Sequence, residues 1–255
     1  EKILFKLEFI FLKFIDFLVF PLMERANFFQ SIKKINKIKF FEFKNFFPKK
    51  FNPEKSNVFE KFLEENRIYN KHIICHLGSI GPSHHIKEII DAIKYLNKDI
   101  ILIIGGVSIN NYHRELKKKI DDQNLSKNIF IFENIKNSLW FEILFKSSLG
   151  LCFYQITNLN HQYMAGTSQK FNNYLFANIP MIVNNNDDFL NFKNKFDIFE
   201  TADPLDPKDI AKKINYILDN KERFIELKKN SKKIFNEELN FENKFEKSYK
   251  IFLDF

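Results

Sequence analysis

Short apolar runs alternate with amphipathic segments from Lys71 to Asn220, and this alternation most constrains the fold. The segment HIKEIIDAIKYL, for example, places Ile86, Ile89 and Ile93 on one helical face. Strands that alternate with helices form parallel sheets, and strands without polar alternation are covered by helices on both sides. We therefore predict an α/β fold with a Rossmann-like, doubly wound parallel sheet. Its five expected strands are HIICHLG, DIILIIGG, NIFIFEN, LGLCFY and IPMIV.

The segments on either side of this region predict further units. A helix (about 1–14), a strand (Phe17–Phe20), a helix (Met23–Ile35) and a strand (Ile38–Phe43) suit the N-terminal residues. A short helix is expected at 58–68, and the tail 222–254, which lacks Gly and Pro, is expected to be helical. We divide the chain into residues 1–50, a linker at 51–68, a main domain at 69–235 and a C-terminal helix at 236–255 that packs on residues 1–20.

Composition and patterning exclude several classes of protein. Hydrophobic residues at 45% and charged residues at 28% are typical of globular chains. The net charge of +8 comes with no basic patch that carries a base-reading motif, so we expect no nucleic-acid partner. Cys75 and Cys152 lie inside apolar runs without metal-ligand spacing, which indicates buried thiols, a reducing compartment and no metal site.

The apolar N-terminal stretch is interrupted by charged residues. Lys6, Glu8, Lys13 and Asp16 make it a poor membrane span, and it does not resemble a signal peptide. We expect a cytoplasmic protein. An apolar, lysine-bearing helix is compatible with peripheral contact to the inner face of a membrane.

All six glycines lie between residues 78 and 166. Ligands of doubly wound sheets bind beyond the carboxyl ends of the strands, where glycine permits close approach. The loop from Gly78 to Gly81 leads from a strand into a helix and suits an anion, and Gly105-Gly106 suits a base or ribose. An ordinary turn is an equal alternative for each loop taken alone.

The third glycine loop precedes the segment SQKFNNYLFAN. Thr167 or Ser168 can cap this helix, and Lys170 can neutralise a diphosphate together with the backbone amides. Asn173 lies about one turn further, on roughly the same face. The alternative makes Lys170 a solvated helix residue and Asn173 a polar surface position.

These motifs together resemble the C-terminal nucleotide-sugar domain of GT-B glycosyltransferases of group 1 (family 4), over about residues 70–254. The most specific match is the family's Ser-x-Lys-hydrophobic-hydrophobic-Glu-Tyr motif with its Ala and Pro. The residues in register with it are Ser168, Lys170, Phe171, Tyr174, Ala177 and Pro180. FIDFLVFPLMERANFF and KNFFP also resemble the last units of the family's acceptor domain. We therefore expect the chain to begin inside that domain, with residues 1–50 as its remnant.

The resemblance implies transfer of a sugar from a nucleotide diphosphate sugar to a saccharide or lipid-linked acceptor, with retention and without metal or cofactor. Surface polysaccharide biosynthesis in a bacterium is the expected setting. The implied catalytic residues are His84 and Lys170, with His84 acting more strongly when protonated. The implied donor-binding residues are Gly78, Ser79, Gly105, Gly106, Glu133, Gly166, Thr167, Ser168 and Asn173.

Several positions depart from the family pattern. Ser79 stands where the family often has Arg, and His84 where it has Lys or Arg. Asn173 replaces the ribose-binding Glu, Ala165 replaces the Glu that pairs with it, and Glu133 replaces a Gly.

Two alternatives therefore stay open. One is a non-catalytic nucleotide-sugar-binding partner subunit. The other is a GT-B-fold epimerase, for which Glu133 and Asp187 are the obvious acid/base groups. His161 precedes the Gly166 loop and can contact the sugar or phosphate, although a surface-loop histidine is the favoured alternative. We expect Trp140 in core or helix packing and Lys117–Lys119 on a solvated face.

Overall fold

A computed structural model describes residues 7–8, 10–33, 38–96 and 99–253 of the chain. Its main feature is a six-stranded sheet with the order β5-β4-β3-β6-β7-β8, and every neighbouring pair is parallel. The order reverses between β3 and β6, so the predicted doubly wound α/β sheet is confirmed. The strands are β3 (His72–Leu77), β4 (Ile100–Gly106), β5 (Ile129–Glu133), β6 (Leu149–Cys152), β7 (Met181–Asn184) and β8 (Phe199–Ala202).

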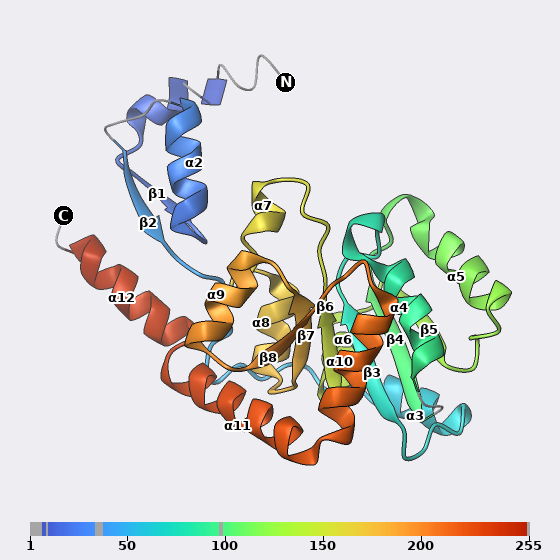
Figure 1. Cartoon of the computed structure of the whole chain (residues 1–255). Helices are drawn as coiled ribbons and strands as arrows, with labels where there is room; N and C mark the ends of the chain where they lie inside the picture. The colour runs from blue at the N-terminus through green and yellow to red at the C-terminus, as the bar shows by residue number, and fades with distance from the viewer. Residues whose placement is uncertain (1–6, 9, 34–37, 97–98, 254–255) are drawn as a thin grey trace.

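Helices cover both faces of this sheet, as Figure 1 shows. One face packs α4 (Ile86–Ala92), α5 (Tyr112–Asp122) and α10 (Pro207–Asp219) on the sheet. The other packs α3 (Val58–Glu65), α6 (Asn137–Lys146), α8 (Gln169–Phe176) and α9 (Asp187–Lys195). Helix α11 (Lys221–Glu237) contributes Leu227 to the first face and Phe235 to the second. Covering both faces explains why the strands could be recognised as uninterrupted apolar runs.

Some elements differ from the sequence prediction. Strand β8 and helix α9 were not predicted, because the short segment FETA has no apolar run and the helix is polar on most of its surface. The expected helix from His85 to Leu96 is divided. His85 has a left-handed backbone (φ 51°) and separates the 3-10 turn η2 (Pro82–His84) from α4. The C-terminal end of the expected helix forms a second 3-10 turn, η3 (Ile93–Tyr95). The two short helices η4 (Ile109–Asn111) and α7 (Leu159–Gln162) lie in loops at the carboxyl ends of strands.

The N-terminal residues form a separate small unit. Strands β1 (Phe17–Phe20) and β2 (Lys39–Glu42) pair in parallel, with α2 (Met23–Lys33) between them in sequence. Both strands and this helix were predicted. Residues 7–8 and 10–11 are helical and lead into η1 (Leu12–Phe14), while the remainder of the helix predicted at 1–14 lies outside the described residues.

The last helix, α12 (Phe241–Leu253), returns to the N-terminal unit (Figure 1). The Phe241 N–H donates to the Phe47 carbonyl at 2.9 Å, and the Ser248 hydroxyl donates to the Glu42 carbonyl at 2.8 Å. The Phe43 ring lies 5.5 Å from that of Phe241. These contacts and the Lys49 N–H, which donates to the Glu242 carboxylate, join α12 to residues 42–49.

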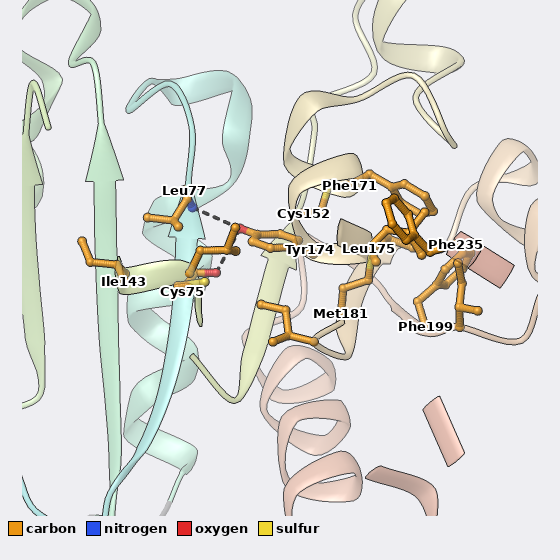
Figure 2. Close-up of a cluster of buried hydrophobic side chains, with 14 of the residues drawn as sticks. Cys75, Leu77, Ile143, Cys152, Phe171, Tyr174, Leu175, Met181, Phe199 and Phe235 are labelled. Atoms are coloured by element: carbon orange, nitrogen blue, oxygen red, sulfur yellow. Dashed lines mark hydrogen bonds between the residues drawn. The ribbon is translucent and has the colours of Figure 1, made fainter. Parts of the chain in front are cut away.

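Tyr174 fills the core at the point where the strand order reverses (Figure 2). Strands β3 and β6 pair only at Ile74–Cys75, so the two strands then separate. The buried Tyr174 hydroxyl lies in this gap. It accepts a hydrogen bond from the Leu77 N–H at 3.1 Å and lies 3.2 Å from the carbonyls of Cys75 and Leu151. Tyr174 thus satisfies backbone groups that the separating strands leave unpaired, directly beneath the rim where a ligand would bind.

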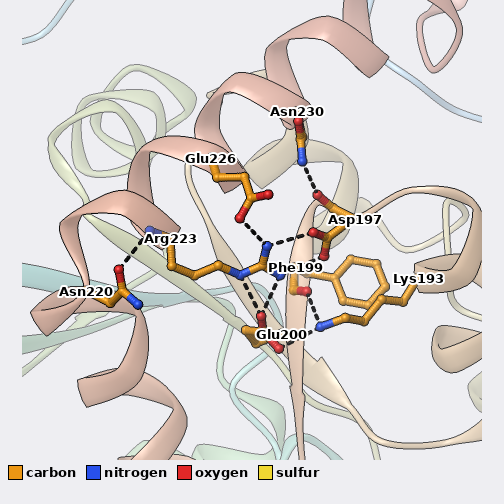
Figure 3. A network of polar contacts seen from close by, with 8 residues as sticks. All are labelled: Lys193, Asp197, Phe199, Glu200, Asn220, Arg223, Glu226 and Asn230. Atoms are coloured by element: carbon orange, nitrogen blue, oxygen red, sulfur yellow. Dashed lines mark hydrogen bonds and ion pairs between the residues drawn. The ribbon is translucent and has the colours of Figure 1, made fainter.

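Arg223 ties the edge strand β8 to α11 (Figure 3). Its guanidinium donates to both carboxylate oxygens of Asp197 at 2.6 Å and to Glu200 at 2.6 Å, and it also contacts Glu226. Lys193 pairs with the same Glu200 at 2.6 Å. This network covers the last strand of the sheet with charged side chains, which protects the edge from pairing with another chain.

Two further predictions concern the cysteines and the membrane. Cys75 and Cys152 are both free and fully buried, as predicted, and burial raises the pKa of the Cys75 thiol to about 12. Among the residues that the structure describes, none of the helices has the length and apolar character needed to cross a bilayer.

Candidate functional site

Two adjoining cavities lie at the carboxyl ends of β3, β4 and β6. They have volumes of about 480 and 390 Å³ and share Gly78, Ser79, Trp140 and Gln169 as walls. The larger one is also lined by Phe47, Phe51, Gly106, Val107, Ile135, Asn137, Phe141 and Asn173. The smaller one is also lined by Leu77, Ser83, His84, Ile109, Tyr154, His161, Met164 and Lys170. This position beside the strand-order reversal is where doubly wound sheets bind ligands.

Glycine opens the space between the two cavities. A Cβ atom on Gly106 would lie 1.7 Å from the Gly78 carbonyl oxygen, and Gly106 has a φ of +144°. A Cβ atom on Gly78 would lie 2.9 Å from the Cδ atom of Lys170. The ends of β3 and β4 therefore approach each other and the lysine stem as only glycines allow. The Ser79 N–H beside them has no hydrogen-bond partner in the described part of the chain and is free to bind a ligand.

Lys170 presents a buried ammonium to the smaller cavity. Only 4% of its surface is exposed, and its Nζ donates to His84 Nδ1 at 3.1 Å and lies 4.1 Å from the centre of the Tyr154 ring. Among the described residues no carboxylate lies within 4.0 Å of it. Burial lowers its pKa to about 8. A buried cation without a carboxylate partner is costly, and an anionic ligand would offset that cost. The alternative of a solvated Lys170 does not agree with this burial.

His84 holds this ammonium in place and is itself uncharged. Burial, followed by repulsion from Lys170, lowers its pKa to about 3, while a hydrogen bond with the backbone of Phe153 acts in the opposite direction. Its Nδ1 lone pair accepts from Lys170. The expectation of a protonated His84 that donates to a phosphate does not agree with this geometry, because both ring nitrogens are already engaged and the ring is neutral at pH 7.

Asn173 lines the larger cavity with an unsatisfied amide. The residue is 1% exposed, and neither its side-chain oxygen nor its nitrogen has a partner among the described residues. Buried polar groups are almost always hydrogen-bonded to protein or to ordered water. The amide is therefore available to a ligand with hydroxyl groups. The alternative that Asn173 is a polar surface residue does not agree with its burial.

The loop Gly166–Ser168 shapes the start of α8 but lines neither cavity. The Ser168 hydroxyl accepts from the Phe171 N–H at 3.2 Å, so the predicted N-cap is confirmed. The Thr167 hydroxyl donates to the Tyr163 carbonyl at 3.0 Å. These hydroxyls are engaged within the fold, and the residues that face the cavities come from the first turn of α8 itself.

Two other predicted site residues point elsewhere. The Glu133 carboxylate at the end of β5 is bound by Lys117 at 3.0 Å and by His113 at 3.0 Å, so α5 draws it away from both cavities. Lys117 itself remains exposed, as expected for a residue on a solvated helix face. Gly105 is buried in the sheet, where a Cβ atom would meet the Leu77 side chain at 2.9 Å.

Several residues that line the cavities were not assigned to the site from the sequence, or only as the less favoured alternative. Trp140 was assigned to packing, yet it borders both cavities. Gln169 could have been found, because it precedes Lys170 in the first turn of a helix that faces the rim. His161 lines the smaller cavity from a loop, with its Nδ1 2.8 Å from the Gln155 carbonyl. Tyr154 carried no signal in the sequence, since its role depends on where Lys170 lies in space.

The combined lining favours an anion with a polar, partly aromatic body. Among the described residues, no Asp or Glu lines either cavity, and one lysine and one free backbone N–H face the region where the cavities meet. In the described residues no group of three His, Cys, Asp or Glu side chains is placed to hold a metal ion.

Comparison with known proteins identifies the fold. No protein-family model and no curated protein matches the chain. Among solved structures, Anabaena Alr3699/HepE in complex with UDP and glucose matches with a TM-score of 0.73 and 12% identity, over 94% of this chain and 63% of that one. WaaG, a glycosyltransferase involved in lipopolysaccharide biosynthesis, matches with 0.68 and 13%, over 91% and 61%.

A third match locates the six-stranded part. The C-terminal domain of the group 1 glycosyl transferase LpcC from Francisella tularensis matches with a TM-score of 0.57 and 15% identity, over 74% of this chain and 96% of that domain. The chain thus spans just over 60% of the length of HepE and WaaG and nearly all of the LpcC domain. The resemblance inferred from the motifs is confirmed at the level of fold: this chain has the fold of the group 1 GT-B glycosyltransferases.

Proposed function

We propose that the chain binds the donor of a glycosyltransferase reaction, in which a sugar is moved from a nucleotide diphosphate sugar to a saccharide or lipid-linked acceptor. The observation that carries the proposal is the buried, carboxylate-free ammonium of Lys170 where the two cavities meet. Such a charge suits a diphosphate, which a nucleotide sugar places between its nucleoside and its sugar. HepE, whose fold this chain shares, was solved with UDP and glucose.

The cavities divide naturally between the parts of such a donor. The nucleoside suits the larger cavity, where Trp140 and Phe141 offer ring faces and the free Asn173 amide offers hydrogen bonds to a ribose. The diphosphate suits the junction, beside Lys170 and the Ser79 N–H. The sugar then reaches the smaller cavity near His161. Sugar transfer needs a stabilised diphosphate leaving group, which a preorganised cation and helix amides provide.

Binding can be tested with the tryptophan that the chain contains only once. Because Trp140 borders both cavities, UDP and UDP-glucose should quench its fluorescence with saturation, while uridine, which lacks phosphate, should bind much more weakly. Lys170→Met should abolish the response, and Lys212→Met, at an exposed position of α10, should not. Equal affinity for UDP and uridine would sink the proposal of a diphosphate site.

A non-catalytic nucleotide-sugar-binding subunit is the second candidate. It is favoured by a lining in which no described residue is a carboxylate, and by the amide at Asn173. It predicts saturable UDP-glucose binding without release of UDP when acceptors are supplied. The epimerase alternative has less support, because Glu133 is engaged by α5 and Asp187 lines a different cleft, beside α9.

The acceptor and setting extend the same proposal. Surface polysaccharide or glycolipid synthesis in a bacterial cytoplasm is supported by the shared fold with WaaG, whose reported role is lipopolysaccharide biosynthesis. Exposed apolar side chains in the N-terminal unit, such as Phe11 (64%) and Phe14 (81%), suit peripheral contact with a membrane. Flotation with anionic and with neutral vesicles tests this contact, and no binding to either kind would remove it from the proposal.

A further inference from the structure

An arginine of the N-terminal unit reaches into the loop that precedes α8. Arg25, in the first turn of α2, donates through Nη2 to the carbonyl of Asn160 at 3.0 Å and to that of Tyr163 at 2.8 Å. The same nitrogen lies 3.4 Å from the Thr167 hydroxyl. These partners are 135 to 142 residues away in the sequence, so the contact joins the N-terminal unit to the sheet domain.

The contact is not an ordinary ion pair. Burial lowers the pKa of Arg25, and Asp188 opposes this effect only through its charge at a distance. Within the described residues no carboxylate lies within 4.0 Å of the guanidinium, and its buried Nε has no hydrogen-bond partner. The partly buried guanidinium is therefore held by backbone carbonyls of the loop through charge-assisted hydrogen bonds, which tie the loop to α2.

Asp188 in α9 holds the same loop from the other side. Its Oδ2 accepts from the N–H groups of Met164 and Ala165, both at 2.8 Å. Arg25 therefore binds carbonyls of the loop while Asp188 binds its amides. The two contacts fix residues 160–165 between α2 and α9.

Asn45 and Phe46, which follow β2, contact the end of the same loop and the first turn of α8. The Asn172 amide donates to the Asn45 carbonyl at 3.1 Å, and the Phe46 ring lies 3.3 Å from where a Gly166 Cβ would stand. Arg25 of α2 and residues 45–46 after β2 thus both contact the loop that leads into α8 or α8 itself. The first turn of α8 carries Gln169 and Lys170, which face the cavities.

We propose that Arg25 is a positioning residue for the candidate donor site. Because Arg25 ties residues 160–167 to α2, the affinity of the first turn of α8 for a diphosphate depends on where the N-terminal unit lies. The proposal rests on the proposed function, because it concerns the same anion site. It adds a coupling between the two parts of the chain, and that coupling is reciprocal: UDP binding at α8 must in turn stabilise the contact at α2.

The test compares Arg25→Met and Arg25→Lys with Arg114→Met, which removes the same charge from an exposed position of α5. Amide hydrogen exchange in residues 158–168 and UDP affinity from Trp140 fluorescence are measured well below the melting temperature. Loss of charge-assisted hydrogen bonds should speed exchange in Arg25→Met about tenfold and weaken UDP binding by a similar factor. Arg25→Lys should recover part of both, and Arg114→Met should match the wild type.

Unchanged exchange and unchanged UDP affinity in Arg25→Met would overturn the proposal, as would a fall in melting temperature without either change. If Arg25→Met does not fold, the wild type decides: UDP should slow exchange in residues 23–28 of α2, and no slowing counts against the coupling. If the wild type fails to bind UDP, the proposed function fails. In that case the exchange rates of Arg25→Lys still report whether Arg25 fixes the loop.

Discussion

The sharpest prediction concerns Lys170, whose replacement should make the free protein more stable while removing its ligand. Burial lowers the pKa of Lys170 from 10.5 to about 8. At pH 7 the folded protein therefore holds a proton on Lys170 that the buried environment disfavours. At about 1.4 kcal/mol for each tenfold change in proton affinity, the cost is about 3 kcal/mol. Lys170→Met keeps the unbranched stem that packs on Gly78 and removes the charge.

The gain is partly offset by a lost contact. Without the ammonium, His84 Nδ1 loses its donor at 3.1 Å, which costs about 1–2 kcal/mol for a buried acceptor. The expected net stabilisation at pH 7 is therefore about 1–2 kcal/mol, or a rise of about 2–8 °C in Tm for a chain of this size. The sign also sets the pH dependence. Because the folded pKa lies below the unfolded one, wild-type stability rises between pH 8 and 10.5, and the advantage of Lys170→Met disappears there.

The assay is thermal unfolding at pH 7 and pH 10.5, with and without UDP, and with Lys212→Met as the control. UDP at about 100 times its Kd should stabilise the wild type and the control by about 2.7 kcal/mol and leave Lys170→Met unchanged. A lower Tm for Lys170→Met than for the wild type at pH 7 would refute the idea of an uncompensated charge. If UDP stabilises all three proteins equally, the Lys170 ammonium is not the group that binds the diphosphate.

Three further predictions follow from the same structure. Tyr174→Phe should destabilise the protein by about 1–3 kcal/mol in denaturant unfolding, because the Leu77 N–H loses its acceptor at the reversal of strand order, and an unchanged midpoint would contradict this account. UDP affinity should fall about 30-fold between pH 7 and 9.5 as Lys170 loses its proton, whereas a flat calorimetric profile over this range would exclude the lysine from binding. Asn173→Ala should weaken UDP binding about tenfold but leave inorganic pyrophosphate binding unchanged, and an equal loss for both would place the amide away from the nucleoside.

The sequence alone determined the architecture and the sheet edge at which the candidate site was expected. Uninterrupted apolar strands are expected only where helices cover both faces of a parallel sheet, so the strands from β3 to β7 could be recognised one by one. Glycines at strand ends and an N-cap before Lys170 also located the rim, because backbone geometry restricts which residues fit there. Strand β8 was missed because FETA has no apolar run, and its edge position is fixed by Arg223 from a distant helix.

Tertiary structure decided which side chains meet. In the sequence, Glu133 lies at the end of a strand and Lys170 at the start of a helix, so both were candidates for the site. In the fold, Lys117 and His113 bind Glu133 away from the cavities. Tyr154 and His84 hold Lys170 at the smaller cavity. Charge state followed in the same way, since burial makes His84 neutral and Lys170 an isolated cation. Spacing along a chain limits which residues share an element, but pKa values and cavity linings depend on groups that only folding brings together.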